Sequence, residues 1–147
     1  SRPNHYLPRF IAAGADMITV HVEADHNVAH TLSEIRQAGV LAGLALNPGT
    51  PFETVRPFLD QIDLLLPMTV VPGFGGQAFM EDMMCKVEAA AAYRAEHNLN
   101  FHIQVDGGVN ERTAAIAAKA GANVMVAGSS AFNAPDMAEA ITAMRKA

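Results

Sequence analysis

Five short apolar runs alternate with segments of helical periodicity along this chain. Most of the runs are apolar at consecutive positions, which is typical of strands in a parallel sheet that is covered on both faces. We therefore predict strands at residues 17–22, 41–46, 62–71, 101–106 and 123–128.

Helical patterns fill the intervals between these strands. A helix that starts near Val28 is followed by Gly39, which is placed to end it. The sequence from Thr50 to Glu53 has the form of a capping box, with proline at the first helical position. Further helices are predicted at residues 5–13, at 81–96, from a cap at Asn110 to a stop at Gly121, and from Asp136 onward.

The chain thus consists of one helix followed by five βα units. Right-handed crossovers lay the strands of such units side by side in one parallel sheet. With 147 residues, 50% of them hydrophobic and 17% charged, the chain can bury a sizeable core. We expect residues 1–147 to form a single α/β domain.

Charge and cysteine content narrow the range of partners. The formal net charge is -5 and no run of Lys or Arg occurs, so neither nucleic acid nor an anionic membrane is an expected partner. No apolar segment approaches the roughly 18 residues of a membrane span, and nothing at the start resembles a signal peptide. The single cysteine, Cys85, cannot form an internal disulfide, which fits a cytoplasmic protein.

Three of the predicted strands end in glycine-rich turns. Glycine lets backbone amides approach a ligand closely, and successive amides beside a helix N-terminus favour an anion such as phosphate. The alternative is that each glycine only makes a tight turn. Because the carboxyl ends of parallel strands share one rim, we predict a phosphate site there. Its candidate residues are Gly75 and Gly76, Gly107 and Gly108, and Gly128 and Ser129.

Three other residues near strand ends are candidates for chemistry. Asp106 closes an alternating strand and precedes two glycines, so it could act as a general base or a metal ligand, or simply cap the turn. Met68 would face the sheet interior near the same rim, as a substrate neighbour or as a core residue. His21 lies near the end of the first predicted strand and is equally well explained as a ligand or as a core histidine.

The sequence resembles the ribulose-phosphate 3-epimerase family over essentially the whole chain. The segments that carry the resemblance, in the order and spacing of the family, are VHVEA, GLALNPGTP, MTVVPGFGGQAF, QVDGGVN and VAGSSAF. The resemblance implies a (β/α)8 barrel that interconverts D-ribulose 5-phosphate and D-xylulose 5-phosphate through an enediolate, with two aspartates exchanging the proton at C3. It implies that the three glycine-rich ends hold the sugar phosphate. It also implies that Asp106 is one of the two aspartates and a ligand of a divalent metal, commonly zinc.

The chain departs from the family at its start and within its third predicted strand. The opening SRPNHYL resembles the segment just after the third strand of the family. The first three strands, the second catalytic aspartate and two histidine metal ligands are therefore expected to be absent. Only Asp106 would remain of four metal ligands, so tight metal binding is not expected. Pro67 lies inside the third predicted strand and favours a sheet edge or a bulge, because proline cannot donate to the ladder.

The expected fold is a partial, truncated TIM barrel of the ribulose-phosphate-binding type, with an open doubly wound sheet as the alternative. In that alternative the leading helix would cover the concave face. The truncated chain would be a barely active or inactive epimerase. Other readings are an epimerase for a different ketose, a half-barrel module that binds phosphate or a sugar phosphate without catalysis, and a structural fragment. Two exposed sheet edges and an open concave face favour self-association as a homodimer.

Overall fold

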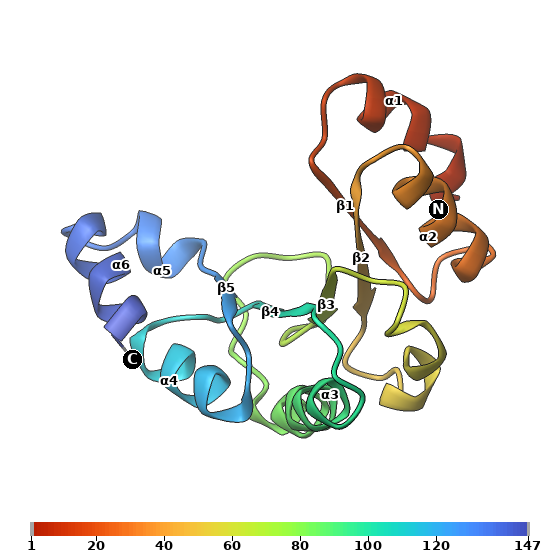
Figure 1. Cartoon of the computed structure of the whole chain (residues 1–147). Coiled ribbons are helices and arrows are strands. Elements are labelled where there is room, and N and C mark those ends of the chain that lie inside the picture. The colour runs from red at the N-terminus through yellow and green to blue at the C-terminus, as the bar shows by residue number, and fades with distance from the viewer. Residues whose placement is uncertain (1, 147) are drawn as a thin grey trace.

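Five parallel strands form one sheet with helices packed along it (Figure 1). The computed structural model describes residues 2–146. The strands are β1 (Met17–His21), β2 (Leu41–Leu46), β3 (Leu64–Pro67), β4 (His102–Asp106) and β5 (Val124–Val126). The α-helices are α1 (Leu7–Ala12), α2 (Val28–Gln37), α3 (Met84–Glu96), α4 (Glu111–Ala120), α5 (Ser129–Phe132) and α6 (Met137–Lys146). Short 3-10 helices are η1 (Pro3–His5), η2 (Phe52–Thr54), η3 (Arg56–Phe58) and η4 (Glu81–Met83).

Each strand pairs with its neighbour in sequence, in the order β1-β2-β3-β4-β5, and every pairing is parallel. The predicted α/β class and the five parallel strands are therefore confirmed. The register puts the carboxyl ends of the strands along one rim, with His21 beside Ala45 and Asp106 beside Val126. The loops that follow these ends are consequently neighbours, although they are far apart in sequence.

The two faces of the sheet are packed differently. The main core joins the outward side chains of all five strands to the helices, and its fully buried members include Leu32 and Ile35 of α2, Leu65 of β3 and Ile103 of β4. The second cluster lies on the concave face and consists of strand and strand-end residues, namely Ala45, Leu64, Leu66, Met68 and Val70, with Met17 against it. No helix residue of the described chain belongs to this second cluster.

The leading helix does not cover the concave face. Leu7 of α1 belongs to the main core. Asn4 of η1 hydrogen-bonds to Thr31 and Glu34 of α2, and α1 lies next to α2 in Figure 1. The doubly wound alternative is therefore wrong for residues 2–146, and the partial barrel describes the fold. The reason is that Leu7 is buried in the main core and Asn4 hydrogen-bonds to α2, which hold this segment on the helix side of the sheet, while Phe10 remains exposed.

Local sequence signals identified most of the other helices, but they missed α5 and predicted a regular helix after Thr50 that does not form. Asn110 and Thr113 form a reciprocal capping box at the start of α4, and Gly121 ends that helix at a φ of 111°. The capping box predicted from Thr50 does not form, because the Thr50 hydroxyl donates to the Glu23 carboxylate instead. Two short 3-10 helices, η2 and η3, replace a regular helix there, and Pro57 in η3 removes a donor that an α-helix would need.

Pro67 lies in the central strand rather than at a sheet edge, so that expectation was wrong. It is the last residue of β3 and stands beside Leu46 of β2. On the side of β4, the regular pairing stops after Leu65, which stands beside Ile103. It resumes only as a single bridge between Met68 and Asp106. The spacing between partners is the same before and after the gap, so the proline interrupts the ladder without forming a bulge.

Candidate functional site

A small cavity of about 140 Å³ lies at the rim formed by the carboxyl ends of β3, β4 and β5. It contains all six residues predicted to bind phosphate, together with Asp106. Its lining residues are Val70, Phe74, Gly75, Gly76, Gln77, Asp106, Gly107, Gly108, Val126, Gly128 and Ser129. Three strand ends that are distant in sequence thus meet around one space. Whether this space binds phosphate remains a prediction.

The turn after β4 can be made only by glycine. Gly107 and Gly108 have φ values of 117° and 68°, which side-chain-bearing residues rarely adopt. A Cβ atom on Gly107 would come within 2.3 Å of the Val70 side chain, and one on Gly108 within 2.4 Å of the backbone nitrogen of Phe79. The backbone of this turn therefore lies directly against the loop that follows β3.

The loop between Val71 and Phe79 is held in shape by its own glutamine. The Gln77 Nε2 group donates to the carbonyl of Val71 at 2.7 Å and to that of Phe74 at 2.8 Å. The Met80 amide closes the loop by donating to the Thr69 carbonyl at 2.9 Å. Sequence reasoning missed both Gln77 and Thr69. The polar type of Gln77 among glycines was the available signal, whereas nothing in the sequence marked Thr69.

The rim is also held from the side of the helices. The Thr113 hydroxyl of α4 donates to the Gly108 carbonyl at 3.0 Å, and the Ser130 hydroxyl of α5 donates to the Val109 carbonyl. Helix α5, which sequence analysis did not predict, begins at the cavity residue Ser129. The carbonyls of Gly108 and Val109 are thus bonded by side chains of the helices.

Met68 and Asp106 lie together but differ in their surroundings. They are bridge partners at the ends of β3 and β4. Asp106 lines the cavity, whereas Met68 is 8% exposed, belongs to the concave cluster and is not a lining residue. The role of Met68 as a substrate neighbour therefore stays a prediction.

A second polar cluster occupies the ends of β1 and β2. The Glu23 carboxylate accepts hydrogen bonds from the Asn47 amide at 2.6 Å and from the Thr50 hydroxyl, and His21 Nδ1 lies 3.1 Å from it. Partial burial raises the pKa of the Glu23 carboxyl, but the hydrogen bonds from Asn47, Thr50 and His21 outweigh it, so the pKa lies below its usual range. The Lys86 ammonium of α3 donates to the carbonyls of Asn47, Pro48 and Thr50 at 3.3, 2.6 and 2.7 Å.

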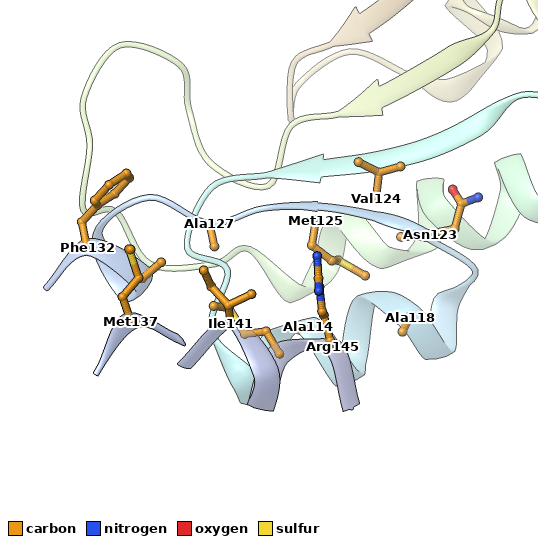
Figure 2. Close-up of a pocket in the computed structure, with 13 residues that line it drawn as sticks. Ala114, Ala118, Asn123, Val124, Met125, Ala127, Phe132, Met137, Ile141 and Arg145 are labelled. Carbon is orange, nitrogen blue, oxygen red and sulfur yellow. The ribbon is translucent and has the colours of Figure 1, made fainter. Parts of the chain in front are cut away.

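A larger cavity, about 610 Å³, lies away from the rim among β5, α4, α5 and α6 (Figure 2). Its lining is mostly alanine, methionine and other apolar residues, and Arg145 is its one charged side chain. Phe132, Met137 and Ile141 border it and are 79%, 48% and 37% exposed. This apolar groove at the sheet edge lacks converging polar groups, so the rim cavity is the candidate functional site.

Comparison with known proteins adds a family to this geometry. The model of the ribulose-phosphate 3 epimerase family matches residues 1–132. The ribulose-phosphate 3-epimerase of Bacillus subtilis (strain 168) is 42% identical over 144 residues, covering 97% of this chain and 66% of its own. The chloroplastic ribulose-5-phosphate-3-epimerase of Arabidopsis thaliana is 43% identical over 145 residues, covering 97% of this chain and 52% of its own. The chain thus spans between about half and two thirds of the length of these curated relatives.

Solved structures agree on the fold. The 3-hexulose-6-phosphate synthase from Salmonella typhimurium superposes with a TM-score of 0.67 at 22% sequence identity. The superposition covers 94% of this chain and 64% of the synthase. At that level of identity the likeness concerns architecture alone.

Proposed function

Because the chain belongs to the ribulose-phosphate 3-epimerase family, we propose that it carries the phosphate-binding side of a site that interconverts D-ribulose 5-phosphate and D-xylulose 5-phosphate. The observation that carries the proposal is the rim cavity. Asp106 and the glycine-rich ends of three separate strands line one space, and these are the segments that resemble the family in sequence.

In this proposal the backbone amides hold the phosphate and Asp106 moves a proton. Amides in loops with positive φ can converge on an anion, and no lysine or arginine lines the cavity, so binding would rest on the backbone. Asp106 lines the same cavity, and a carboxylate there can exchange the proton at C3 of a bound sugar. Epimerisation also requires an acid–base group on the opposite face of that carbon. Asp106 is the single carboxylate among the cavity's lining residues.

A divalent metal does not fit the residues described. A zinc site normally uses three or four protein ligands, and residues 2–146 contain no group of three His, Cys, Asp or Glu side chains that could surround an ion. Asp106 could supply one ligand. We therefore assign the proton transfer to Asp106 alone.

We expect the 147-residue chain by itself to epimerise slowly or not at all while still binding phosphate. The single carboxylate at the cavity supports this expectation, and it also favours the second reading, a module that binds phosphate or a sugar phosphate without catalysis. A related ketose phosphate could replace the pentulose phosphate, because the residues that line the cavity belong to the phosphate end.

The deciding experiment is a titration with inorganic phosphate followed by amide NMR. Millimolar phosphate should shift the amides of Gly75, Gly76, Gly107, Gly108, Gly128 and Ser129. The amides of Gly39 and Gly121 serve as internal controls, because they also have positive φ but do not line the cavity. Unshifted rim amides would overturn the proposed site.

An assay of D-ribulose 5-phosphate epimerisation, with and without added zinc, then separates the readings. Turnover that is lost in Asp106→Asn, while phosphate shifts persist, supports an epimerase. Phosphate shifts without turnover support the binding module. Absence of both would leave a structural fragment.

Self-association as a homodimer is a further part of the proposal. Strands β1 and β5 are the edges of the described sheet, and edges invite pairing with another chain. The apolar groove beside β5 adds exposed Phe132, Met137 and Ile141. Light scattering at several concentrations should report a dimer that Phe132→Asp weakens. The control Phe10→Asp changes a phenylalanine that is also exposed but lies in α1, and it should have no effect. A monomer throughout would contradict self-association.

We also propose that residues 1–147 form one domain that works in the cytoplasm. One sheet runs through the described chain, and its main core extends from Leu7 to Ala122, so thermal unfolding should show a single transition. Among residues 2–146, no helix has both the length and the apolar character needed to cross a membrane. The free thiol of Cys85 is exposed, which is compatible with a reducing compartment, and cell fractionation tests this assignment.

A further inference from the structure

We infer that Thr69 is a positioning residue that aims the backbone amides of Gly107 and Gly108 into the rim cavity. The Thr69 side chain is completely buried and follows β3. Its hydroxyl donates to the carbonyl of Asp106 at 2.8 Å and to that of Gly107 at 2.7 Å, so one proton is shared between two successive carbonyls. The inference deepens the proposed function and rests on it for the identity of the ligand.

The planarity of the peptide bond turns these two contacts into an orientation. In a trans peptide the C=O and the following N–H point in opposite directions. Because the Asp106 carbonyl points towards Thr69, the N–H of Gly107 points away from Thr69. In the same way, the Gly107 carbonyl points towards Thr69 and the N–H of Gly108 points away from it. Thr69 itself does not line the cavity, whereas both glycines do. Both glycines also have positive φ, and without a Cβ they have the widest choice of conformations to lose.

Thr69 lies just beyond a gap in the pairing between β3 and β4. The pairing of β3 with β4 is interrupted at Pro67, which has no amide hydrogen. Beyond this gap, the Thr69 amide donates to the Asp106 carbonyl at 3.0 Å, and the Thr69 carbonyl accepts the Met80 amide that closes the neighbouring loop. One residue thus joins the end of β4 to both ends of the loop after β3.

Three variants separate positioning from a merely structural role. Thr69→Val keeps the shape of the side chain and removes its hydroxyl donor, whereas Thr69→Ser retains a hydroxyl. The control Thr31→Val makes the same change at another fully buried threonine, which lies in α2 and does not line the cavity. For each folded variant, residual dipolar couplings report the directions of the Gly107 and Gly108 amide bonds, and NMR titration gives the Kd for inorganic phosphate.

Thr69→Val should turn these two amide bonds and weaken phosphate binding by about tenfold, the loss expected for one mispositioned hydrogen-bonding group. Thr69→Ser should restore both to wild-type values, and Thr31→Val should change neither, even if it lowers the unfolding midpoint. Unchanged amide directions in Thr69→Val would overturn the inference. If wild type binds no phosphate, the proposed function fails, but the amide directions still decide the role of Thr69. If Thr69→Val does not fold, the same two measurements on Thr69→Ala apply.

Discussion

Gly108 and Phe79 lie so close together that a Cβ atom on Gly108 would be 2.4 Å from the backbone nitrogen of Phe79. The two residues belong to loops that follow different strands, β4 and β3. Backbone therefore meets backbone at the rim, with no room for a side chain between them. This contact explains the glycines at the end of β4 more fully than turn geometry alone does, because it brings the loops after β3 and β4 together at the cavity.

Substituting Gly108 should damage both stability and the cavity. Gly108→Ala introduces a methyl group at a φ of 68° against fixed backbone, so we expect a loss of about 1–3 kcal/mol in the free energy of unfolding. Urea denaturation measures this loss, and NMR titration should show weaker phosphate binding. The control is Gly75→Ala, because Gly75 lacks positive φ and a Cβ there would meet nothing within 4 Å. Equal stabilities for the two variants would contradict the explanation.

The Glu23 carboxylate should make stability depend on pH in the acid range. The pKa of Glu23 is lowered in the folded state, so the unfolded state binds more protons in the acid range. The stabilisation that Glu23 gives the folded state is therefore fully present above its unfolded-state pKa, about 4.3 for glutamate. That contribution is lost as the pH falls through the lower folded-state pKa. Wild type should therefore exceed Glu23→Gln in unfolding free energy at pH 6, and the difference should shrink at pH values well below 4.

Urea titrations at a series of pH values test this prediction. The matched control is Glu88→Gln, which changes an exposed glutamate of α3. A difference between wild type and Glu23→Gln that stays constant with pH would show that the hydrogen bonds to Glu23 do not favour its charged form.

Lys86 should rigidify the loop after β2. Its ammonium donates to three carbonyls of residues 47–50, and hydrogen bonds from charged groups are among the stronger ones. Lys86→Met keeps the aliphatic stem and removes the charge, so we expect a loss of about 1–3 kcal/mol in the free energy of unfolding and faster hydrogen exchange of the Thr50 amide. Lys119→Met, at an exposed position in α4, should change neither quantity. Unaltered exchange at Thr50 in Lys86→Met would mean that the loop keeps its shape without the ammonium.

The 147-residue chain should not retain zinc. Residues 2–146 present no group of three candidate ligands, and one carboxylate at the cavity cannot supply the usual three or four. Elemental analysis after dialysis against zinc should find much less than one ion per chain, with Asp106→Asn no different from wild type. Stoichiometric zinc would contradict this prediction, and the first ligands to substitute would then be His21 and Glu23, whose Nδ1 and Oε2 atoms lie 3.1 Å apart.

Features that depend on a few neighbouring residues could be read from the sequence. The capping box at Asn110, the stop at Gly121 and the five parallel strands all follow from short-range patterns, and the structure has each of them. The six candidate phosphate residues follow from the rule that parallel strands end at a common rim, and Asp106 follows from its place at a strand end before two glycines; all seven line one cavity. Strand ends were less well predicted, since residues 62–71 contain a strand of only four residues, Leu64–Pro67.

The sequence by itself determined the alternation of strands and helices, the rim on which the glycines gather, and the family, because each is encoded in local pattern and motif. Only the tertiary structure decided which partner each polar group found. The Thr50 hydroxyl bonds to Glu23 rather than capping a helix, and the Thr69 hydroxyl bonds to carbonyls 37 and 38 residues away. Leu7 likewise packs in the main core rather than on the concave face. In each case a donor or an apolar side chain could have had several partners that are distant along the chain. The partner is determined only when the folded sheet brings these groups together.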